Sequence, residues 1–171
     1  KDDTPVCGLE LPVFSAMKEQ LDERNAVLLG ASTQDVDSKK AWVASGLEAP
    51  NVPLLADVGG EVAKAYDMLP EDTSGTSEGR TPADNATVRT VFIIGPDKKV
   101  KLSLTYPMTT GRNFDEILRA LDSIQLTAKH QVATPANWKQ GEDVIITPAV
   151  SNEDAKERFG EFETVLPYLR K

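Results

Sequence analysis

The chain has little of three features that often define a protein's chemistry, which are cysteine, histidine and long hydrophobic runs. It is 171 residues long and contains one cysteine, Cys7, and one histidine, His130. A single cysteine excludes an internal disulfide and argues against cysteine-based zinc sites, which usually need two or more thiolates. A single histidine leaves little room for Ser-His-Asp or Cys-His catalysis. We therefore expect no metal or other cofactor.

Charge and hydropathy limit which classes of partner and which cellular compartment we expect for this chain. The 27 acidic and 19 basic residues give a formal charge of -8 and a pI near 4.7, which argues against nucleic-acid binding. No apolar run approaches the ~20 residues of a membrane span, and the N-terminus lacks the apolar core of a signal peptide. A lone cysteine fits a reducing compartment best. We expect a cytoplasmic protein, or an organellar one if a targeting segment has been removed.

Hydrophobic periodicity predicts alternating helices and strands. After Cys7, apolar residues recur at helical spacing at Leu11, Phe14, Met17 and Leu21. The predicted elements are a helix beginning near Cys7, a strand at 26–32, a helix at 35–45 with Trp42 inward, a strand at 52–57, a helix at 60–66 with Val62, Ala63 and Tyr66 on one side, a hairpin of 90–94 and 100–106, and a helix at 113–126. This order indicates an α/β fold in which helices flank a mixed central sheet.

The last part of the chain differs in composition. We predict that residues 1–126 form the main domain, with an exposed loop at 70–85, and that residues 127–171 form a small C-terminal appendage. The appendage has too little apolar content for a core of its own. We expect it to bury Val144, Ile145 and Ile146 against the main domain or a second subunit.

Cys7 is the candidate nucleophile. A free thiol has a pKa near 8.5, and catalysis by cysteine requires more thiolate than that value gives at neutral pH. The predicted helix start would bring unpaired N–H groups and the positive end of the helix dipole to the sulfur. Thr4 could donate a hydrogen bond to it, and Arg89, at the start of an apolar strand, could supply a cation.

Each of these residues also has a structural interpretation. A lone cysteine near a helix start is more often a small buried apolar residue than a nucleophile. Arg89 could be the partner in a structural ion pair, and Thr4 a plain helix cap.

Two motifs favour the catalytic interpretation. Thr4-Pro5-Val6-Cys7 resembles the peroxiredoxin active-site signature Pro-x-x-x-Thr-x-x-Cys, and residues 88–99, which begin Val-Arg-Thr-Val-Phe, resemble the strand that carries that family's active-site arginine. Two further segments resemble its 1-Cys branch, namely Tyr-Pro-Met-Thr-Thr-Gly-Arg-Asn at 106–113 and Val-Ala-Thr-Pro-Ala-Asn-Trp at 132–138.

The resemblance implies a thioredoxin-like fold and a thiol-dependent peroxidase that reduces hydrogen peroxide and organic hydroperoxides. It implies that Cys7 is the peroxidatic cysteine, with Thr4 and Arg89 as its activating partners. Glu10 would orient an arginine, and Arg112 would be a second arginine near the pocket. An external thiol of the glutathione or thioredoxin type would restore the oxidised cysteine. A homodimer or higher homo-oligomer is expected.

The chain also departs from that family. Gly8-Leu9 stands where Thr-Thr is usual. The family's first hairpin and central strand lie upstream of Lys1, so we expect the chain to lack the family's N-terminus. Two alternatives stay open, a redox sensor that passes its oxidation to a partner cysteine and a chaperone-like protein with an idle thiol.

Overall fold

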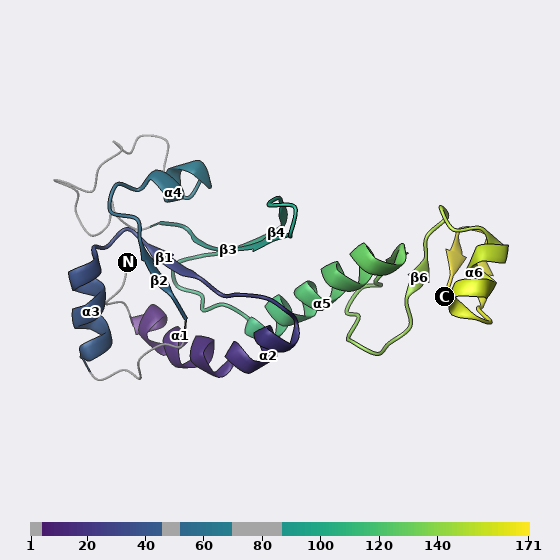
Figure 1. Cartoon of the computed structure of the whole chain (residues 1–171), viewed down its shortest axis with the longest axis horizontal. Helices are drawn as coiled ribbons and strands as arrows, with labels where there is room; N and C mark the ends of the chain where they lie inside the picture. Colours follow the sequence, from purple (N-terminus) through teal and green to yellow (C-terminus); the bar gives the residue numbers. More distant parts are fainter. Residues whose placement is uncertain (1–4, 46–51, 70–86) are drawn as a thin grey trace. The chain divides into compact units, whose positions relative to one another are not determined.

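The computed structural model describes residues 5–45, 52–69 and 87–171 (Figure 1). It divides the chain into two compact units, Lys1–Arg112 and Asn113–Lys171. The predicted loop at 70–85 lies outside the described residues. The helix after Asn113 belongs to the second unit in this division, whereas the sequence prediction placed the boundary at residue 126.

The first unit contains, in chain order, α1 (Pro5–Ala16), α2 (Lys18–Glu23), β1 (Gly30–Ser32), α3 (Val36–Ala44), β2 (Leu54–Ala56), α4 (Glu61–Ala65), β3 (Arg89–Ile94) and β4 (Val100–Tyr106). The predicted apolar stripe is confirmed, because Leu11, Met17 and Leu21 are buried. It extends over two helices rather than one. The N–H of Met17 is shared between the carbonyls of Val13 and Phe14, which marks the junction of α1 and α2.

The strands form two ladders in the part of the chain that the structure describes. β1 and β2 pair in parallel, with Gly30 opposite Leu54, and β3 and β4 form the predicted antiparallel hairpin. The predicted α/β fold with both parallel and antiparallel strands is confirmed, although no described strand is hydrogen-bonded between the β1–β2 ladder and the β3–β4 hairpin. The predicted strand at 26–32 is also shorter. Only its last three residues are paired, and Val27 is 81% exposed.

An acidic side chain fixes the start of α3, the helix that follows β1. Asp35 accepts the N–H of Ser38 at 2.8 Å, and this bond and the Ser38 hydroxyl lower the pKa of Asp35. Such a cap satisfies an N–H that the helix itself leaves unpaired. Trp42 is buried on α3 as predicted, and on α4 Ala63 is buried while Val62 is 49% exposed.

The second unit contains α5 (Phe114–His130), β5 (Val132–Ala133), β6 (Ile145–Ile146), α6 (Asn152–Phe159), β7 (Thr164–Leu166) and β8 (Leu169–Arg170). Asn113 caps α5 by accepting the N–H of Glu116. The side chain of Arg119 donates two hydrogen bonds to Glu116, at 2.6 and 2.8 Å, and lowers the pKa of that carboxyl. α5 is one turn longer than predicted and stops where Gln131 adopts a left-handed conformation.

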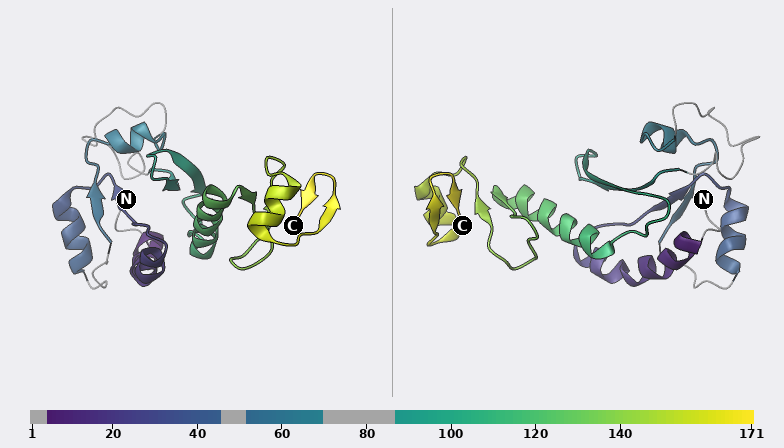
Figure 2. Two further views of the ribbon diagram at one scale, coloured as in Figure 1. Left: turned by 45° about the vertical axis from the view of Figure 1, so that its right-hand side comes forward. Right: turned by 180° about the vertical axis from the view of Figure 1, so that it is seen from behind.

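A small sheet and α6 form a core inside this second unit. The strand order is β5-β6-β8-β7. The yellow end of the chain, which contains α6, β7 and β8, forms one group in both views of Figure 2. The cluster between them consists of Ile146, Val150 and Ala155, with Phe159 and Phe162 packed against it. Ile146 is thus buried within the unit itself. Docking of this unit on the main domain or on a second subunit stays a prediction.

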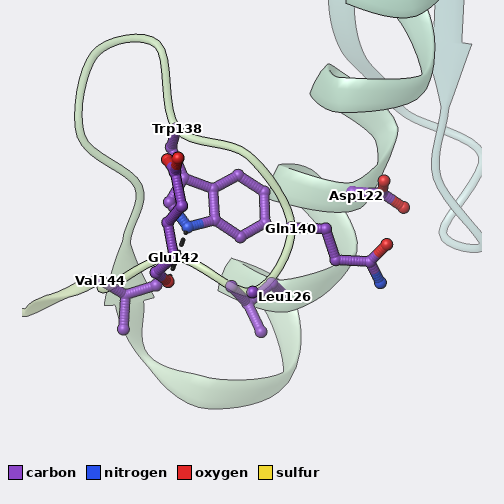
Figure 3. Close-up of a pocket in the computed structure, with 7 residues that line it drawn as sticks. Asp122, Leu126, Trp138, Gln140, Glu142 and Val144 are labelled. Atoms are coloured by element: carbon purple, nitrogen blue, oxygen red, sulfur yellow. Dashed lines mark hydrogen bonds between the residues drawn. The ribbon is translucent and has the colours of Figure 1, made fainter.

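Two polar side chains organise the irregular segments of the second unit. Arg170 is buried and donates to the carbonyls of Thr147 and Val150 and to the amide oxygen of Asn152, each at 2.7 Å. The indole N–H of Trp138 donates to the carbonyl of Glu142 beside a pocket of about 240 Å³ (Figure 3). None of the helices described here is long and apolar enough to cross a bilayer.

Candidate active site

Cys7 lies in the first turn of α1 and is half-buried as a free thiol. Pro5 is the first residue of the helix, a position where proline's fixed φ suits the helix and its missing N–H costs nothing. The N–H groups of Val6 and Cys7 have no acceptor four residues back within the helix. The sulfur therefore lies at the positive end of α1, where a negative charge is stabilised.

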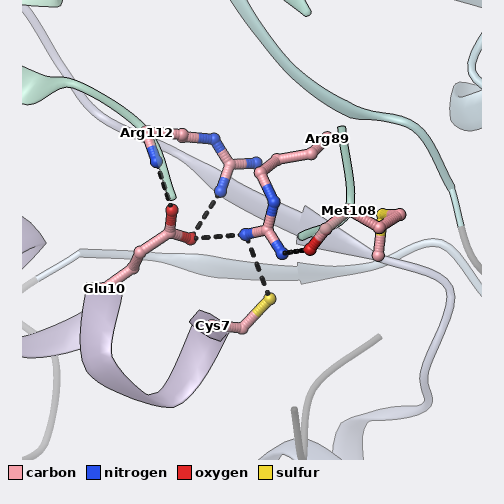
Figure 4. Close-up of polar contacts among 5 residues, drawn as sticks. All are labelled: Cys7, Glu10, Arg89, Met108 and Arg112. Carbon is pink, nitrogen blue, oxygen red and sulfur yellow. Dashed lines mark hydrogen bonds and ion pairs between the residues drawn. The ribbon is translucent and has the colours of Figure 1, made fainter. Parts of the chain in front are cut away.

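Arg89 brings a cation to this sulfur. It begins β3, is only 4% exposed, and its Nη1 lies 3.7 Å from Sγ of Cys7 (Figure 4). Its Nη2 donates to the carbonyl of Met108 at 3.1 Å. The hairpin register places Arg89 opposite Tyr106, two residues before Met108, so the turn after β4 comes back to the guanidinium.

Glu10 holds this arginine and a second one. Glu10 is one helical turn after Cys7, so both side chains lie on one face of α1. Its Oε2 accepts from Nη1 of Arg89 at 3.0 Å and from Nη1 of Arg112 at 2.6 Å, and its Oε1 accepts the backbone N–H of Arg112 at 3.0 Å. Figure 4 shows one oxygen of the carboxylate joined to both guanidinium groups.

The charges of this cluster favour an anion at the sulfur. Two guanidinium groups and one carboxylate sum to one positive charge when Cys7 is a neutral thiol, and to zero when it is a thiolate. The side chains of Arg89 and Glu10 are 3% and 7% exposed, so solvent screens their charges little.

One donor of the buried arginine has no acceptor. Nε of Arg89 is buried and has no hydrogen-bond partner among the described residues. A buried donor without a partner costs about 1–3 kcal/mol, and an acceptor oxygen bound beside it would recover part of that energy.

The structure brings together four of the five predicted site residues, which are Cys7, Glu10, Arg89 and Arg112. Thr4 lies outside the described residues. Met108 was not predicted as part of the site. Its contribution is a backbone carbonyl, which leaves no signal in the residue type, although the pairing of β3 with β4 could have located it. No group of three or more potential metal-ligating side chains occurs in the described parts of the chain.

Two family models match the chain. The model of the AhpC/TSA family matches residues 1–103, and the model described as the C-terminal domain of 1-Cys peroxiredoxin matches residues 123–161.

Curated relatives match along nearly the whole chain. The mitochondrial peroxiredoxin PRX1 of Saccharomyces cerevisiae is 43% identical over 175 residues, which cover 99% of this chain and 66% of the yeast protein. The 1-Cys peroxiredoxin A of Oryza sativa is 44% identical over 181 residues, covering 99% of this chain and 80% of the rice protein.

Solved structures match in three dimensions as well. A structure of the yeast mitochondrial 1-Cys peroxiredoxin, described as the basis of its thiol resolving mechanism via glutathione and thioredoxin systems, superposes with a TM-score of 0.89 and 42% identity. The match covers 99% of this chain and 80% of the yeast chain. A mutant of peroxiredoxin 6 from Arenicola marina superposes with a TM-score of 0.85 and 41% identity over the same shares.

Proposed function

The chain belongs to the 1-Cys peroxiredoxins, a family of thiol-dependent peroxidases with a thioredoxin-like fold, and from that premise we propose that Cys7 reduces hydrogen peroxide and organic hydroperoxides. The observation that carries the proposal is the 3.7 Å contact between Sγ of Cys7 and the buried guanidinium of Arg89. A buried cation held at a half-buried thiol at a helix start is the environment that a nucleophilic thiolate needs.

In the proposed reaction the Cys7 thiolate attacks the terminal oxygen of the peroxide. A sulfur–oxygen bond forms, the O–O bond breaks, and the leaving hydroxide or alkoxide takes up a proton to become water or an alcohol. The sulfur is oxidised by two electrons to a sulfenic acid, and the peroxide is reduced by the same two electrons.

Arg89 would serve both the nucleophile and the leaving group. Its Nη1 stabilises the thiolate, and its unpartnered Nε–H can donate to a peroxide oxygen as negative charge develops along the breaking bond. Glu10 and Arg112 would act as positioning residues, since their bonds fix the guanidinium without touching the sulfur. We place Thr4 in the same site on the strength of the signature motif.

An external thiol would complete the cycle. With one cysteine in the chain, the sulfenic acid must condense with a thiol from another molecule, which releases water and leaves a mixed disulfide. A second thiol then attacks the outer sulfur and frees Cys7. Glutathione and thioredoxin-type proteins are the proposed reductants, in line with the description of the yeast structure. We further propose a homodimeric or larger assembly and a reducing compartment, cytoplasmic or organellar.

Stopped-flow measurement of peroxide consumption by the chain tests the activity. We expect second-order reduction of hydrogen peroxide and of cumene hydroperoxide, with one equivalent consumed per Cys7 in the first phase, before further oxidation of the sulfenic acid, when no thiol is present. The matched control is Cys7→Ser, which keeps the size of the side chain and should consume none. Consumption by that variant at the same rate would exclude Cys7 as the reacting group.

A further inference from the structure

The first turn of α1 is held less firmly than the turn that follows it. From the second turn on, α1 is anchored by the three hydrogen bonds of the Glu10 carboxylate and by Leu11, which is 2% exposed. Among the described residues, the first turn has one side-chain hydrogen bond to the rest of the unit, from Arg89 to Sγ of Cys7.

A proline and a glycine lie at the border between these two parts. Pro12 is inside α1 and has no N–H, so the carbonyl of Gly8 lacks the donor that position 12 of a regular helix would supply. Proline also disfavours the helical conformation of the residue before it. Glycine gains more backbone conformational entropy on unwinding than any other residue, so Gly8 favours the unwound turn. The space beside it is open, because a Cβ built on Gly8 meets nothing within 4 Å.

Oxidation would weaken the contact that holds the first turn. A thiolate is attracted to the Arg89 guanidinium at 3.7 Å, whereas a neutral sulfenic acid offers it only a weak hydrogen bond. Glu10, Leu11 and both arginines keep their own contacts when the sulfur changes. Unwinding after oxidation is therefore confined to the residues before Glu10.

We propose that Gly8 and Pro12 determine which thiols can restore oxidised Cys7, by lowering the free energy needed to unwind the first turn of α1. A thiol as small as glutathione can reach the half-buried sulfur in the intact turn. A protein dithiol cannot bring its own cysteine within bonding distance until residues 5–9 unwind. This proposal rests on the proposed peroxidase function and assigns its reductant specificity to two residues outside the catalytic contacts.

Variants that restore regular helix at these two positions test the proposal. Gly8→Ala places a methyl group in open space, and Pro12→Ala changes an exposed residue and returns the missing N–H. Replacing glycine by alanine in a helix changes the equilibrium about fivefold, so the population of the unwound turn should fall by about that factor. Pro12→Ala should lower it at least as much. The matched control is Val13→Ala, a substitution on the neighbouring exposed position that leaves the backbone hydrogen bonds unchanged.

The full chain is oxidised with one equivalent of peroxide and mixed with either glutathione or thioredoxin, and the return of the free thiol is followed. We expect both variants to restore Cys7 about fivefold more slowly with thioredoxin and to change the rate with glutathione by less than about twofold. Val13→Ala should change neither rate. Equal slowing with both reductants, or no slowing with thioredoxin, would overturn the assignment to Gly8 and Pro12.

Hydrogen exchange gives a readout that does not depend on the reductant. Backbone amides of residues 9–11, which in a regular helix donate to the carbonyls of residues 5–7, should exchange faster after oxidation in the wild-type chain, and this acceleration should shrink in Pro12→Ala. If oxidation leaves their exchange unchanged, the turn does not unwind and the proposal is wrong. Oxidation of Cys7 by peroxide is measured first in the same sample. If the chain is not a peroxidase, Cys7 stays unoxidised, which differs from both faster and unchanged amide exchange after oxidation.

Discussion

Replacing Arg89 by alanine should lower the reactivity of Cys7 more than it lowers the stability of the fold. At 3.7 Å, opposite unit charges attract by about 4.5 kcal/mol at an effective dielectric constant of about 20. Glu10 accepts from the same guanidinium nitrogen and offsets part of this attraction, so we take about half, roughly 2 kcal/mol, as available to the thiolate. That energy corresponds to about a 30-fold change in an equilibrium constant.

The assay has two parts. The rate constant for hydrogen peroxide should fall about 30-fold or more, because the variant loses both thiolate stabilisation and a donor for the breaking O–O bond. The rate of alkylation of Cys7 by iodoacetamide at a fixed neutral pH should fall as well, because the contact between the guanidinium and the sulfur is lost. Arg89→Lys should recover part of both effects, since an ammonium group keeps the charge but cannot reach Cys7, Glu10 and the Met108 carbonyl together.

A matched control separates this effect from the general loss of an arginine. Arg119→Ala removes a side chain of the same kind whose partner, Glu116, lies on the surface of α5. It should leave the peroxide rate and the alkylation rate unchanged. Unchanged peroxide and alkylation rates in Arg89→Ala would show that the guanidinium does not act on the sulfur, and the reasoning from the 3.7 Å contact would be refuted.

Four further outcomes are expected. Glu10→Gln should lower the free energy of unfolding in urea by about 3 kcal/mol, because it leaves the buried guanidinium of Arg89 and the partly buried one of Arg112 without their anion; an unchanged midpoint would contradict this. Arg170→Ala should destabilise the second unit by about 2–3 kcal/mol in thermal melts, since the buried carbonyl of Val150 and the partly buried one of Thr147 lose their donor. Glu116, whose pKa Arg119 lowers below 4.5, contributes stability above its unfolded pKa that is lost as pH falls through the lower folded pKa, so Glu116→Gln should make melting temperatures less sensitive to acid below about pH 4.5. Excess peroxide without thiol should add two and three oxygens to the Cys7 peptide by mass spectrometry, whereas a stoichiometric disulfide would contradict a one-cysteine mechanism.

The predictable part of the structure is the part with regular periodicity. The stripe of Leu11, Met17 and Leu21 and the hairpin of β3 and β4 were predicted because burial on one face imposes a period on the sequence. The run at 26–32 was predicted as a longer strand than the three paired residues of β1. Apolar composition indicates that a segment can be a strand, but its paired length depends on which other strands lie beside it.

The candidate site was predictable to a different degree at each residue. The cluster of Cys7, Arg89 and Arg112 came from motifs, because no local pattern reports that residues 82 or more positions apart will meet. Chemistry alone predicted that the thiol needs a cation, and Arg89 was the candidate on that ground as well. The carbonyl of Met108 could not be predicted from residue type, because any residue at that position supplies the same group.

The distribution of contacts explains how such a site can survive each change of its own sulfur. Three hydrogen bonds converge on the Glu10 carboxylate, and Arg89 has a further bond to the Met108 carbonyl, so both guanidinium groups stay in place without any help from Cys7. The sulfur is joined to the cluster by one contact whose strength depends on its negative charge. Under the proposed unwinding, the thiolate would hold the first turn of α1 closed and a sulfenic acid or mixed disulfide would release it, while the cation stays where the next thiolate forms. A network centred on the cysteine itself would lose this property, because it would come apart in every catalytic cycle.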